Sequence, residues 1–426
     1  MESTIKTTCT KKQVEELIER ENLAYQKINL PFGLTTAGRD RSQTSAKIFA
    51  HDFKGKSVLD IGCFLGYFCH EAVRRGAGRV VGIDVDENRL RQARLLAECL
   101  NLPIEYQRID IEQDDPPGQF DIILLLNVLH HIRNPISLLD KLTSHTRERL
   151  IMEIAGPESP QADELLKLIG ASWLTRRRIN KLPLIVVGRD QTITKKNEQK
   201  FFFSFPALKH LLIEQRGSYA RLDLINSHFK NRYIAVAWKL RIENLIIVGG
   251  PTAAGKSTLL KRLLNQKICP IAAAIGMQTD NPWMGKTPSS LKETGQEKIE
   301  NLLYHYDLLR PWGNDARTYE REQGLDVLDC ARVRKVITLW CEPKTMRRRL
   351  EDELKTVKRH WHRQRIKDVL DLYHDGKRLA ERLLTWTDYC KHKGAQLLFI
   401  DCTGEPQMLS LADWERKIQN LQHDAI

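Results

Sequence analysis

The sequence predicts an α/β protein of two domains, each built around a largely parallel sheet. The chain has 426 residues, more than one ordinary domain needs. Short apolar runs alternate with amphipathic segments from Ser57 onward, and a second series of this kind starts at Asn244. Each series opens with a glycine-containing turn, and almost no linker separates the two. We therefore expect domains over residues 43–240 and 241–426, preceded by an N-terminal helix and a lid loop over residues 1–42.

The first series supplies most elements of the first domain. Residues 12–29 have a helical pattern, and the polar stretch after Pro31 is typical of a loop. Helices are expected from about Tyr67 and through Leu100. The runs that we expect to form strands are SVLDIGC, RVVGIDV, IEYQRID, FDIILLLNVL and RLIMEIAG. Because such units give parallel strands, the carboxyl ends of these strands should meet at one edge, where α/β folds bind ligands.

The pattern is less regular in the middle of the chain. Residues 160–200 are more polar, which indicates an insertion. A helix near Pro206–Gln215 and the strands YARLDLIN and RYIAVAWKL follow. The second series contains the predicted strands NLIIVGG, NLLYHYDLL, KVITLWCE and QLLFIDC.

Composition excludes several classes of protein. Hydrophobic residues make up 42% and charged residues 28%, an ordinary globular mixture. No run approaches the roughly 20 apolar residues that cross a bilayer, and the segment from Met1 to Gln13 lacks an apolar signal core. The nine cysteines include no C-x-x-C pair, which favours reduced thiols over disulfides or a zinc site. We therefore expect a cytoplasmic protein without a membrane span.

The net charge of +13 is compatible with RNA or another anionic partner. The excess is spread evenly, with +7 before Arg241 and +6 from there to the end. The densest group of basic side chains lies between Arg347 and Lys367. This group forms either the solvated face of a helix or a lid that faces phosphate, and the sequence leaves both open.

The first glycine turn predicts a ligand that contains a nucleoside. Gly62 and Gly66 allow backbone to approach a ligand closely. Asp84 ends the next predicted strand, where a carboxylate can accept hydrogen bonds from both ribose hydroxyls. Asp110 ends the third, placed to accept from an adenine amino group. Asp60 precedes the turn, where it would repel a pyrophosphate and suit a cationic sulfonium ligand that carries an ammonium group.

Together with Asn127 after the fourth strand, this ordered set resembles the class I S-adenosylmethionine-dependent methyltransferases over roughly residues 40–240. The resemblance implies a Rossmann-like sheet and S-adenosylmethionine (SAM) as cofactor. The residues that it implies as cofactor contacts are Asp60, Gly62, Gly66, Asp84, Asp110 and Asn127. The family's usual D-x-G-x-G-x-G has glycine where this chain has Phe64, so the turn departs from the family's pattern there.

Two histidines follow Asn127, in a segment that resembles the family's fourth motif, which lines the methyl-transfer site. His130 or His131 can act as a general base for a hydroxyl or phosphate acceptor. Alternatively, one caps the cofactor pocket and the other packs. An acceptor oxygen that is already anionic needs positioning and no base. Arg39 and Arg41, in the loop before the core, either meet an anionic acceptor or are solvated, and the sequence does not separate these.

The second glycine turn has the P-loop pattern G-x-x-x-x-G-K-S between a predicted strand and a helix. In such a loop the backbone amides cradle phosphate oxygens, Lys256 reaches the β and γ phosphates, and Ser257 coordinates magnesium. The expected nucleotide-binding residues are Gly250, Pro251, Thr252, Ala253, Ala254, Gly255, Lys256, Ser257 and Thr258. The loop therefore predicts ATP or GTP, with Mg²⁺, as ligands.

The elements after this loop resemble the small-molecule P-loop kinases over about residues 244–405. Asp307 ends an apolar strand, where the resemblance implies a ligand of magnesium or a group that orients the acceptor hydroxyl. The basic segment that follows would be the lid that closes on the transferred phosphate. The arginines that we expect in this lid are Arg347, Arg348, Arg359 and Arg363.

Two sites in one chain favour a bifunctional enzyme, a methyltransferase joined to an ATP-dependent kinase. The two would act on one acceptor, either a glycan or another small hydroxyl compound. Two alternatives stay open. The positive charge is compatible with an RNA-modifying methyltransferase that has an NTP-binding domain. A P-loop is equally compatible with a nucleotide-sensing module that regulates methyl transfer.

Overall fold

The computed structural model divides into two compact units. Unit 1 comprises Met1–Gln215 and Arg221–Lys239, and unit 2 comprises Arg216–Ala220 and Leu240–Ile426. Each unit has its own hydrophobic core. The residues that the structure describes are 7, 9–156, 167, 170, 172, 174, 178, 181–189, 199–215, 218–230, 232–265, 270–277, 281–287, 290–291, 294–308 and 326–423.

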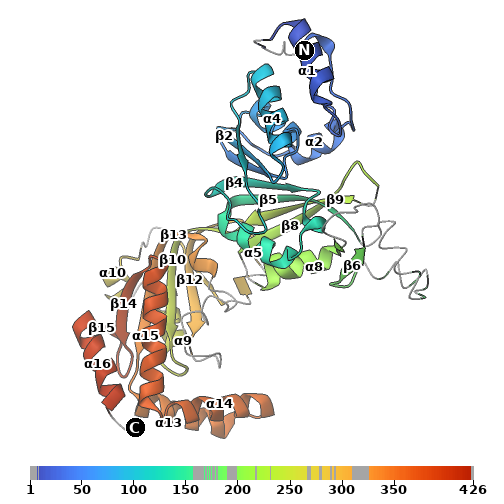
Figure 1. The fold of residues 1–426 in the computed structure, drawn as a ribbon. Coiled ribbons are helices and arrows are strands. Elements are labelled where there is room, and N and C mark those ends of the chain that lie inside the picture. The colour runs from blue at the N-terminus through green and yellow to red at the C-terminus, as the bar shows by residue number, and fades with distance from the viewer. Residues whose placement is uncertain are drawn as a thin grey trace. The chain divides into compact units, whose positions relative to one another are not determined.

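Unit 1 is built on a seven-stranded sheet with the order β3-β2-β1-β4-β5-β9-β8 (Figure 1). Neighbouring strands from β3 to β5 are parallel, and β9 runs antiparallel to β5. The strands are β1 (Ser57–Ile61), β2 (Arg79–Asp84), β3 (Glu105–Arg108), β4 (Phe120–Leu126), β5 (Thr146–Ala155), β8 (Tyr219–Asn226) and β9 (Arg232–Lys239). The predicted Rossmann-like α/β sheet is confirmed, and the carboxyl ends of β1, β2 and β4 lie at one edge.

Helices connect these strands, and two of them begin at a polar side chain that caps the backbone. Asp86 accepts hydrogen bonds from backbone N–H groups at the start of α4, and Asn134 does so at the start of α5. The helices up to this point are α1 (Lys11–Glu21), α2 (Ser42–Ile48), α3 (Tyr67–Arg74), α4 (Glu87–Cys99) and α5 (Pro135–His145), with the 3₁₀ turns η1 (Pro31–Gly33) and η2 (Leu129–His131).

The N-terminal helix is shorter than the predicted range 12–29. Helix α1 ends at Glu21 because Asn22 takes a left-handed conformation (φ 48°), which terminates helices. An isolated β-bridge then joins Gln26 to Arg39. The segment between helices α1 and α2 is therefore a loop held together by this β-bridge and not a continuation of the helix.

Much of the predicted insertion at residues 160–200 lies outside the described residues. Its described part contains the antiparallel pair β6 (Ile185–Arg189) and β7 (Gln199–Phe203). The short helix α8 (Phe205–Lys209) and the π-helix η3 (His210–Gln215) follow, where the sequence predicts a helix.

Unit 2 is built on a six-stranded sheet with the order β11-β12-β10-β13-β14-β15 (Figure 1). All neighbouring strands are parallel except β15, which runs antiparallel to β14. The strands are β10 (Arg241–Gly250), β11 (Met284–Lys286), β12 (Lys298–Asp307), β13 (Ala331–Trp340), β14 (Gln396–Asp401) and β15 (Gln407–Leu409). The strand that leads into the second glycine turn, β10, therefore lies between β12 and β13.

Helix α15 contributes a large buried aromatic side chain to the core of unit 2. Trp386 stacks on Tyr306 with ring centroids 5.3 Å apart, and its Nε1 donates to the Thr338 hydroxyl at 3.0 Å. The helices of unit 2 are α9 (Lys256–Leu264), α10 (Pro270–Ala274), α13 (Pro343–Thr356), α14 (His360–Leu372), α15 (Gly376–His392) and α16 (Leu411–His423), with the 3₁₀ turn η4 (Asp326–Leu328).

The basic segment that the sequence predicts as one helix is two helices. Helix α13 ends at Thr356 because Val357 has an extended backbone (ψ 124°), and Arg359, also extended, precedes α14. The break changes which side chains share a face, because residues on either side of it no longer follow one helical repeat.

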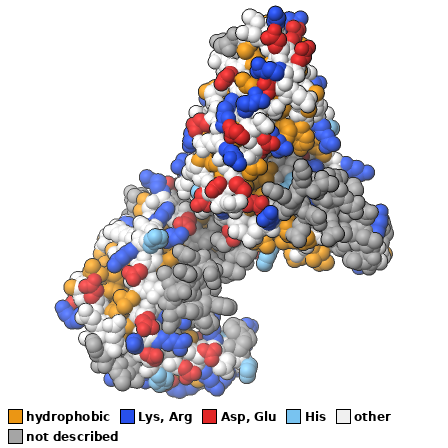
Figure 2. All heavy atoms as spheres, in the orientation of Figure 1, with side chains coloured by type: hydrophobic (Ala, Val, Ile, Leu, Met, Phe, Trp, Pro, Cys, Tyr) orange, Lys and Arg blue, Asp and Glu red, His pale blue; other side chains and the backbone are white. Residues whose placement is uncertain are grey.

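Two properties of the surface bear on the predicted partners. Lys and Arg side chains are interspersed with Asp and Glu over the described surface that Figure 2 shows, in line with the even spread of charge along the sequence. Among the described residues, no helix is both long enough and apolar enough to cross a bilayer.

Candidate functional site

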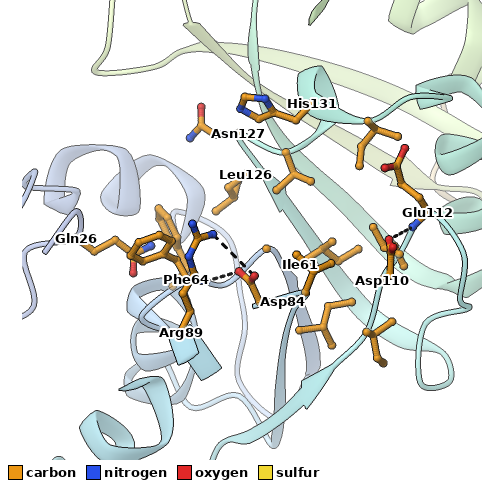
Figure 3. Close-up of a pocket in the computed structure, with 18 of the residues that line it drawn as sticks. Gln26, Ile61, Phe64, Asp84, Arg89, Asp110, Glu112, Leu126, Asn127 and His131 are labelled. Atoms are coloured by element: carbon orange, nitrogen blue, oxygen red, sulfur yellow. Dashed lines mark hydrogen bonds and ion pairs between the residues drawn. The ribbon is translucent and has the colours of Figure 1, made fainter. Parts of the chain in front are cut away.

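A cavity of about 620 Å³ lies at the carboxyl ends of β1, β2 and β4 in unit 1 (Figure 3). Its size is within the range of pockets that bind small molecules and cofactors. The side chains predicted from sequence that line it are Asp84, Asp110, Asn127 and His131, and Gly62 contributes backbone. Asp60, Gly66 and His130 are not among its lining residues.

The glycine turn forms the floor of this cavity. The backbone amides of Gly62 and Cys63 donate to the Ile83 carbonyl at 2.8 and 3.1 Å, which joins the turn to β2. Gly62 has φ 71°, and a Cβ there would lie 2.6 Å from Cγ2 of Val128. Phe64, where the resembled family has glycine, takes φ 56° and places its ring against the cavity. The turn therefore keeps its left-handed conformation despite this departure.

Asp84 presents a buried carboxylate to the cavity. It ends β2, is 6% exposed, and accepts hydrogen bonds from the backbone amides of Phe64 (3.2 Å) and Asp86 (3.0 Å). The Arg89 guanidinium lies 3.9 Å from one carboxylate oxygen and packs over the Phe64 ring. These contacts hold the carboxylate in one orientation, with the cavity as its remaining neighbour.

Asp110 lies beyond the end of β3, on another wall from Asn127 and His131 (Figure 3). Its carboxylate accepts from the backbone amide of Glu112 at 3.1 Å and from Nε2 of Gln113 at 3.0 Å. The position suits an acceptor for an amino group at the far end of an elongated ligand.

Asp60 does not occupy the position expected of a ligand contact. It is 2% exposed, and the Cys69 thiol donates to its carboxylate at 3.4 Å. Burial raises the pKa of Asp60 to about 7, the Cys69 hydrogen bond lowers it, and the nearby charge of Asp84 raises it. The reason is structural: helix α3 contributes Cys69 above the strand and covers this carboxylate. Asp60 therefore lies beneath the turn and does not reach the cavity.

The two histidines have different positions. His131 lines the cavity, whereas His130 is 6% exposed and does not, and their ring centroids are 4.1 Å apart. Asn127 has φ 61°, and its side-chain amide donates to the carboxylate of Glu153, at the end of β5. Glu153 is fully buried and also accepts from the Ser227 hydroxyl at 2.5 Å.

The N-terminal segment contributes residues that sequence reasoning missed. The Gln26 side-chain oxygen accepts from the backbone amides of Leu65 (3.2 Å) and Tyr67 (3.4 Å), next to the glycine turn. Tyr25 and Gln26 line the cavity, although the sequence predicts them as part of a helix. Arg41, for which the sequence left open contact with an anionic acceptor or solvation, lines the cavity too. The polar pattern predicted a loop in this region, but it placed the start of the loop after Pro31, whereas helix α1 already ends at Glu21.

Unit 2 has a second cavity, of about 510 Å³, at the turn between β10 and α9. The loop contains two left-handed residues, Ala253 (φ 63°) and Gly255 (φ 94°). Helix α9 starts at Lys256 with no side-chain cap, so its first backbone N–H groups are available to a ligand. The predicted strand, glycine turn and helix are thus present in the predicted order.

Lys256 is a buried ammonium beside a carboxylate. Its Nζ donates to the carbonyls of Gly250 (3.0 Å) and Pro251 (2.6 Å) and lies 3.7 Å from Asp307. Burial lowers the pKa of Lys256, and the Asp307 carboxylate raises it. The cation therefore stays close to the loop, where an anionic ligand would compete with the carbonyls for it.

Asp307 ends β12 and lies next to the glycine turn, because the parallel pairing of β10 with β12 places Asp307 opposite Gly250. It accepts from the Thr252 hydroxyl at 3.1 Å, and Arg365 lies 3.8 Å away. Ser257 lies 3.4 Å from His305, a lining residue that the sequence analysis did not single out. Among the described residues, no group of three or more His, Cys, Asp or Glu side chains could hold a metal ion.

The arginines at this cavity are not the four that we predicted. Arg349 lines it and donates to the Ala253 carbonyl at 2.9 Å, and Arg262 lines it from α9. Arg347 donates to the Tyr373 carbonyl instead, Arg363 to the carbonyls of Leu354 and Val357 at the end of α13, and Arg348 and Arg359 are exposed. The cause is the helix phase and the break after Thr356, which the repeat of basic residues does not reveal.

Comparisons with known proteins match part of the first unit. Residues 37–185 match the family model described as "Methyltransferase domain". The ubiquinone biosynthesis O-methyltransferase of Rhodopseudomonas palustris (strain TIE-1) is 31% identical over 123 residues, 29% of this chain and 48% of that protein. The protein of the same name from Neisseria meningitidis serogroup C is 38% identical over 90 residues, 20% of this chain and 38% of that protein. The chain thus spans about half the length, or less, of these relatives.

Among solved structures, the N-terminal domain of EvdMO1 in the presence of SAH and D-fucose is similar. Its sequence identity is 15% and its TM-score 0.42, over 54% of this chain and 97% of that chain. The family match indicates a methyltransferase domain over residues 37–185, and the sheet of unit 1 has the Rossmann-like strand order that the sequence analysis expects.

Proposed function

We propose that unit 1 transfers a methyl group from SAM to an oxygen atom of a small-molecule acceptor. The observation that carries the proposal is the buried Asp84 carboxylate, which faces a cavity with the glycine turn beneath it and His131 on its wall. The similarity to O-methyltransferases supports oxygen as the methylated atom. Bound SAM would supply the electrophilic methyl carbon.

The residues at the cavity fit this cofactor. Asp84 is held by two backbone amides so that it can accept from the ribose hydroxyls, and Asp110 can accept from the adenine amino group. Gly62 leaves room where a Cβ would close the floor of the cavity onto Val128. Asp60 would act from beneath the turn, as support for its geometry and not as a direct contact.

The acceptor is expected beside Asn127 and His131. His131 lines the cavity, so it is placed to take the proton of an acceptor hydroxyl, whereas the buried His130 supports its ring from behind. Asn127 is held to Glu153 by two hydrogen bonds, one from its backbone amide (3.0 Å) and one from its side chain. This anchoring gives the methyl-transfer end of the cavity a rigid wall.

We further propose that unit 2 binds a nucleoside triphosphate and transfers its γ-phosphoryl group to a hydroxyl of the same acceptor. The uncapped start of α9, with Lys256, Arg262 and Arg349 around it, supports a polyanionic ligand. Ser257 and Asp307 would hold Mg²⁺ with the phosphates. The position of β10 between β12 and β13 supports this reading, since it puts Asp307 beside the loop.

The test uses the full chain, methyl-labelled SAM and fractionated extract of the source cell, with and without ATP. Wild type and Lys256→Ala are compared, and Lys261→Ala, an exposed lysine of α9, is the matched control. Labelling that needs both ATP and Lys256 supports two linked sites, and γ-phosphate on the same product then excludes a purely sensing P-loop.

Two other outcomes contradict parts of the proposal. Labelling that ignores ATP and Lys256 means that the units act independently. Label that becomes acid-soluble after ribonuclease treatment points to RNA as the acceptor instead of a small molecule.

A further inference from the structure

Arg41 is a buried cation at the cavity of unit 1 without a counter-ion. It is 5% exposed and lines the cavity. Within the part of the chain that the structure describes, no carboxylate forms an ion pair with it, and its buried Nε has no hydrogen-bond partner. Arg89, the other arginine of the cavity, differs because it pairs with Asp84 (3.9 Å) and Asp86 (3.3 Å). Since burial of an unpaired charge is costly, Arg41 indicates a missing anion.

Aromatic side chains hold the Arg41 guanidinium in place. It lies over the rings of Tyr25 (5.6 Å to the centroid) and Phe229 (4.9 Å). Tyr25 in turn contacts Phe64, with ring centroids 4.6 Å apart, so the guanidinium is attached to the wall of the glycine turn. Such contacts orient the cation and offset part of its desolvation, but they leave its N–H groups to be satisfied.

A second arginine reinforces the positive charge. Arg232 begins β9. Its partner on β5 is Ala155, two residues after Glu153. Burial lowers the pKa of Arg232, the charge of Glu153 raises it, and the charges of Arg41 and Arg39 lower it. The Glu153 oxygens already accept from Ser227 and Asn127. The carboxylate whose charge acts on Arg232 is therefore already occupied by two other donors.

The topology places these cations on the acceptor side. Asp84, which ends β2, and Asp110, which follows β3, fit the cofactor and lie on one side of β1. Asn127, Glu153 and Arg232 belong to the edge formed by β4, β5 and β9 on the other side. Arg41 reaches the cavity from the loop before α2, next to Phe229 in the turn between β8 and β9.

We propose that Arg41 binds an anionic group of the methyl acceptor, a carboxylate or a phosphate monoester. The inference rests on the proposed function of unit 1, and it adds the chemical class of its substrate. The acceptor lies with its anionic group at Arg41 and its reacting oxygen toward His131. A phosphate monoester is what unit 2 would release as its product, whereas a carboxylate would have to come from another reaction.

The experiment measures binding by calorimetry to the full chain saturated with SAH. All proteins carry Lys256→Ala, so that phosphate does not bind at the second glycine turn. The probes are phenyl phosphate, benzoate and, as the neutral control, benzyl alcohol. The variants are Arg41→Gln and Arg41→Lys, with Arg39→Gln as the matched control, because Arg39 is exposed on the same loop.

We expect an anionic probe to bind, with Arg41→Gln weakening it by about tenfold or more and Arg39→Gln by less than about threefold. Arg41→Lys should fall between, because it keeps the charge and loses the fork of donors. The stronger of phenyl phosphate and benzoate identifies the source of the anion. The proposal is overturned if neither anion binds, if benzyl alcohol binds as tightly, or if Arg41→Gln binds like wild type. SAH binding of each variant is measured first, and its absence from all of them would refute the proposed function instead.

Discussion

Units 1 and 2 share one local structure, a glycine turn between a buried parallel strand and a helix. The charged side chains around this turn differ between the two units. In unit 1 the turn lies against Asp84 and above Asp60, and the cavity has three carboxylates and two arginines. In unit 2 the turn holds Lys256, and the cavity has Lys256 and two arginines with two carboxylates. Backbone geometry makes both turns able to approach a ligand, and the charged side chains select which ligand.

The fold alone therefore does not assign the ligand. Parallel sheets bind at the carboxyl ends of their strands whatever the ligand is. A carboxylate at the end of β2 suits hydroxyl donors and a cationic ligand, whereas an ammonium at the start of α9 suits phosphate. Changes at one turn should therefore affect one ligand and leave the other unchanged.

The largest effect is expected at Lys256. Lys256→Ala removes the buried ammonium next to the loop and should lower phosphoryl transfer by about 10²–10³-fold, comparable to removing one preorganised donor from an active site. The measurement is nucleotide turnover by the purified full chain, with SAH affinity recorded in parallel. Lys261→Ala, on the exposed side of α9, should retain turnover. Wild-type turnover in Lys256→Ala would show that the charge at this turn does not select phosphate.

The next effect concerns Asp84. Asp84→Asn keeps the size of the side chain but removes the charge and one acceptor, so SAH affinity should fall by about 10–100-fold. Calorimetry with SAH measures this, and nucleotide affinity should not change. Glu105→Gln on β3, an exposed carboxylate paired with Arg79, is the control. Equal losses in both variants would mean that net charge matters and not the position of Asp84.

Alanine substitutions at two glycines of unit 1 distinguish the cost of backbone strain from the cost of a steric clash. Gly62 and Gly55 have nearly equal φ values, 71° and 70°, so alanine costs both about 1 kcal/mol of conformational strain. Only at Gly62 would the new Cβ meet a neighbour, Cγ2 of Val128 at 2.6 Å, whereas nothing lies within 4 Å at Gly55.

Gly62→Ala should therefore lower the free energy of unfolding of unit 1 by about 1–3 kcal/mol more than Gly55→Ala does. Denaturant unfolding of the full chain, followed with a probe in each unit, measures the difference. Equal destabilisation would show that Val128 moves aside and that the turn does not need glycine for space.

The smallest effect is the pH dependence at Asp60. Burial raises its pKa to about 7 in the folded chain, against about 3.9 when unfolded. The folded state therefore binds this proton more tightly, and the associated stability, complete at low pH, is lost as the pH rises through 7.

Between about pH 6 and 8, wild-type unit 1 should lose roughly 1 kcal/mol relative to Asp60→Asn. Unfolding at both pH values gives this difference. An opposite sign would mean that a cationic partner holds Asp60 ionised, as the sequence analysis had assumed.

Several features could be predicted from the sequence because local chemistry determines them. The apolar runs identify strands, the amphipathic segments between them identify helices, and the pairs Gly62/Gly66 and Gly250/Gly255 mark both turns. The Rossmann-like sheet of unit 1 followed from this alternation and is confirmed by the strand order. The end of α1 at Glu21 was missed because a left-handed Asn22 leaves little trace in the helical pattern.

Other features were decided by tertiary structure. Arg39 and Arg41 are two residues apart in one polar loop and have the same chemistry, yet the fold exposes the first and buries the second over Phe229, from the far end of the sheet. Arg349 faces the second cavity instead of Arg347 because the packing of α13 fixes its rotation.

Local sequence therefore accounts for the two glycine turns, the alternating elements around them and the side chains at the strand ends. These depend on neighbours within a few residues. Which charge is buried, which is solvated and which meets a ligand depends on segments distant in the chain, such as α3 over Asp60 and the turn before β9 against Arg41. Desolvation and pairing set those outcomes, and both are properties of the packed chain.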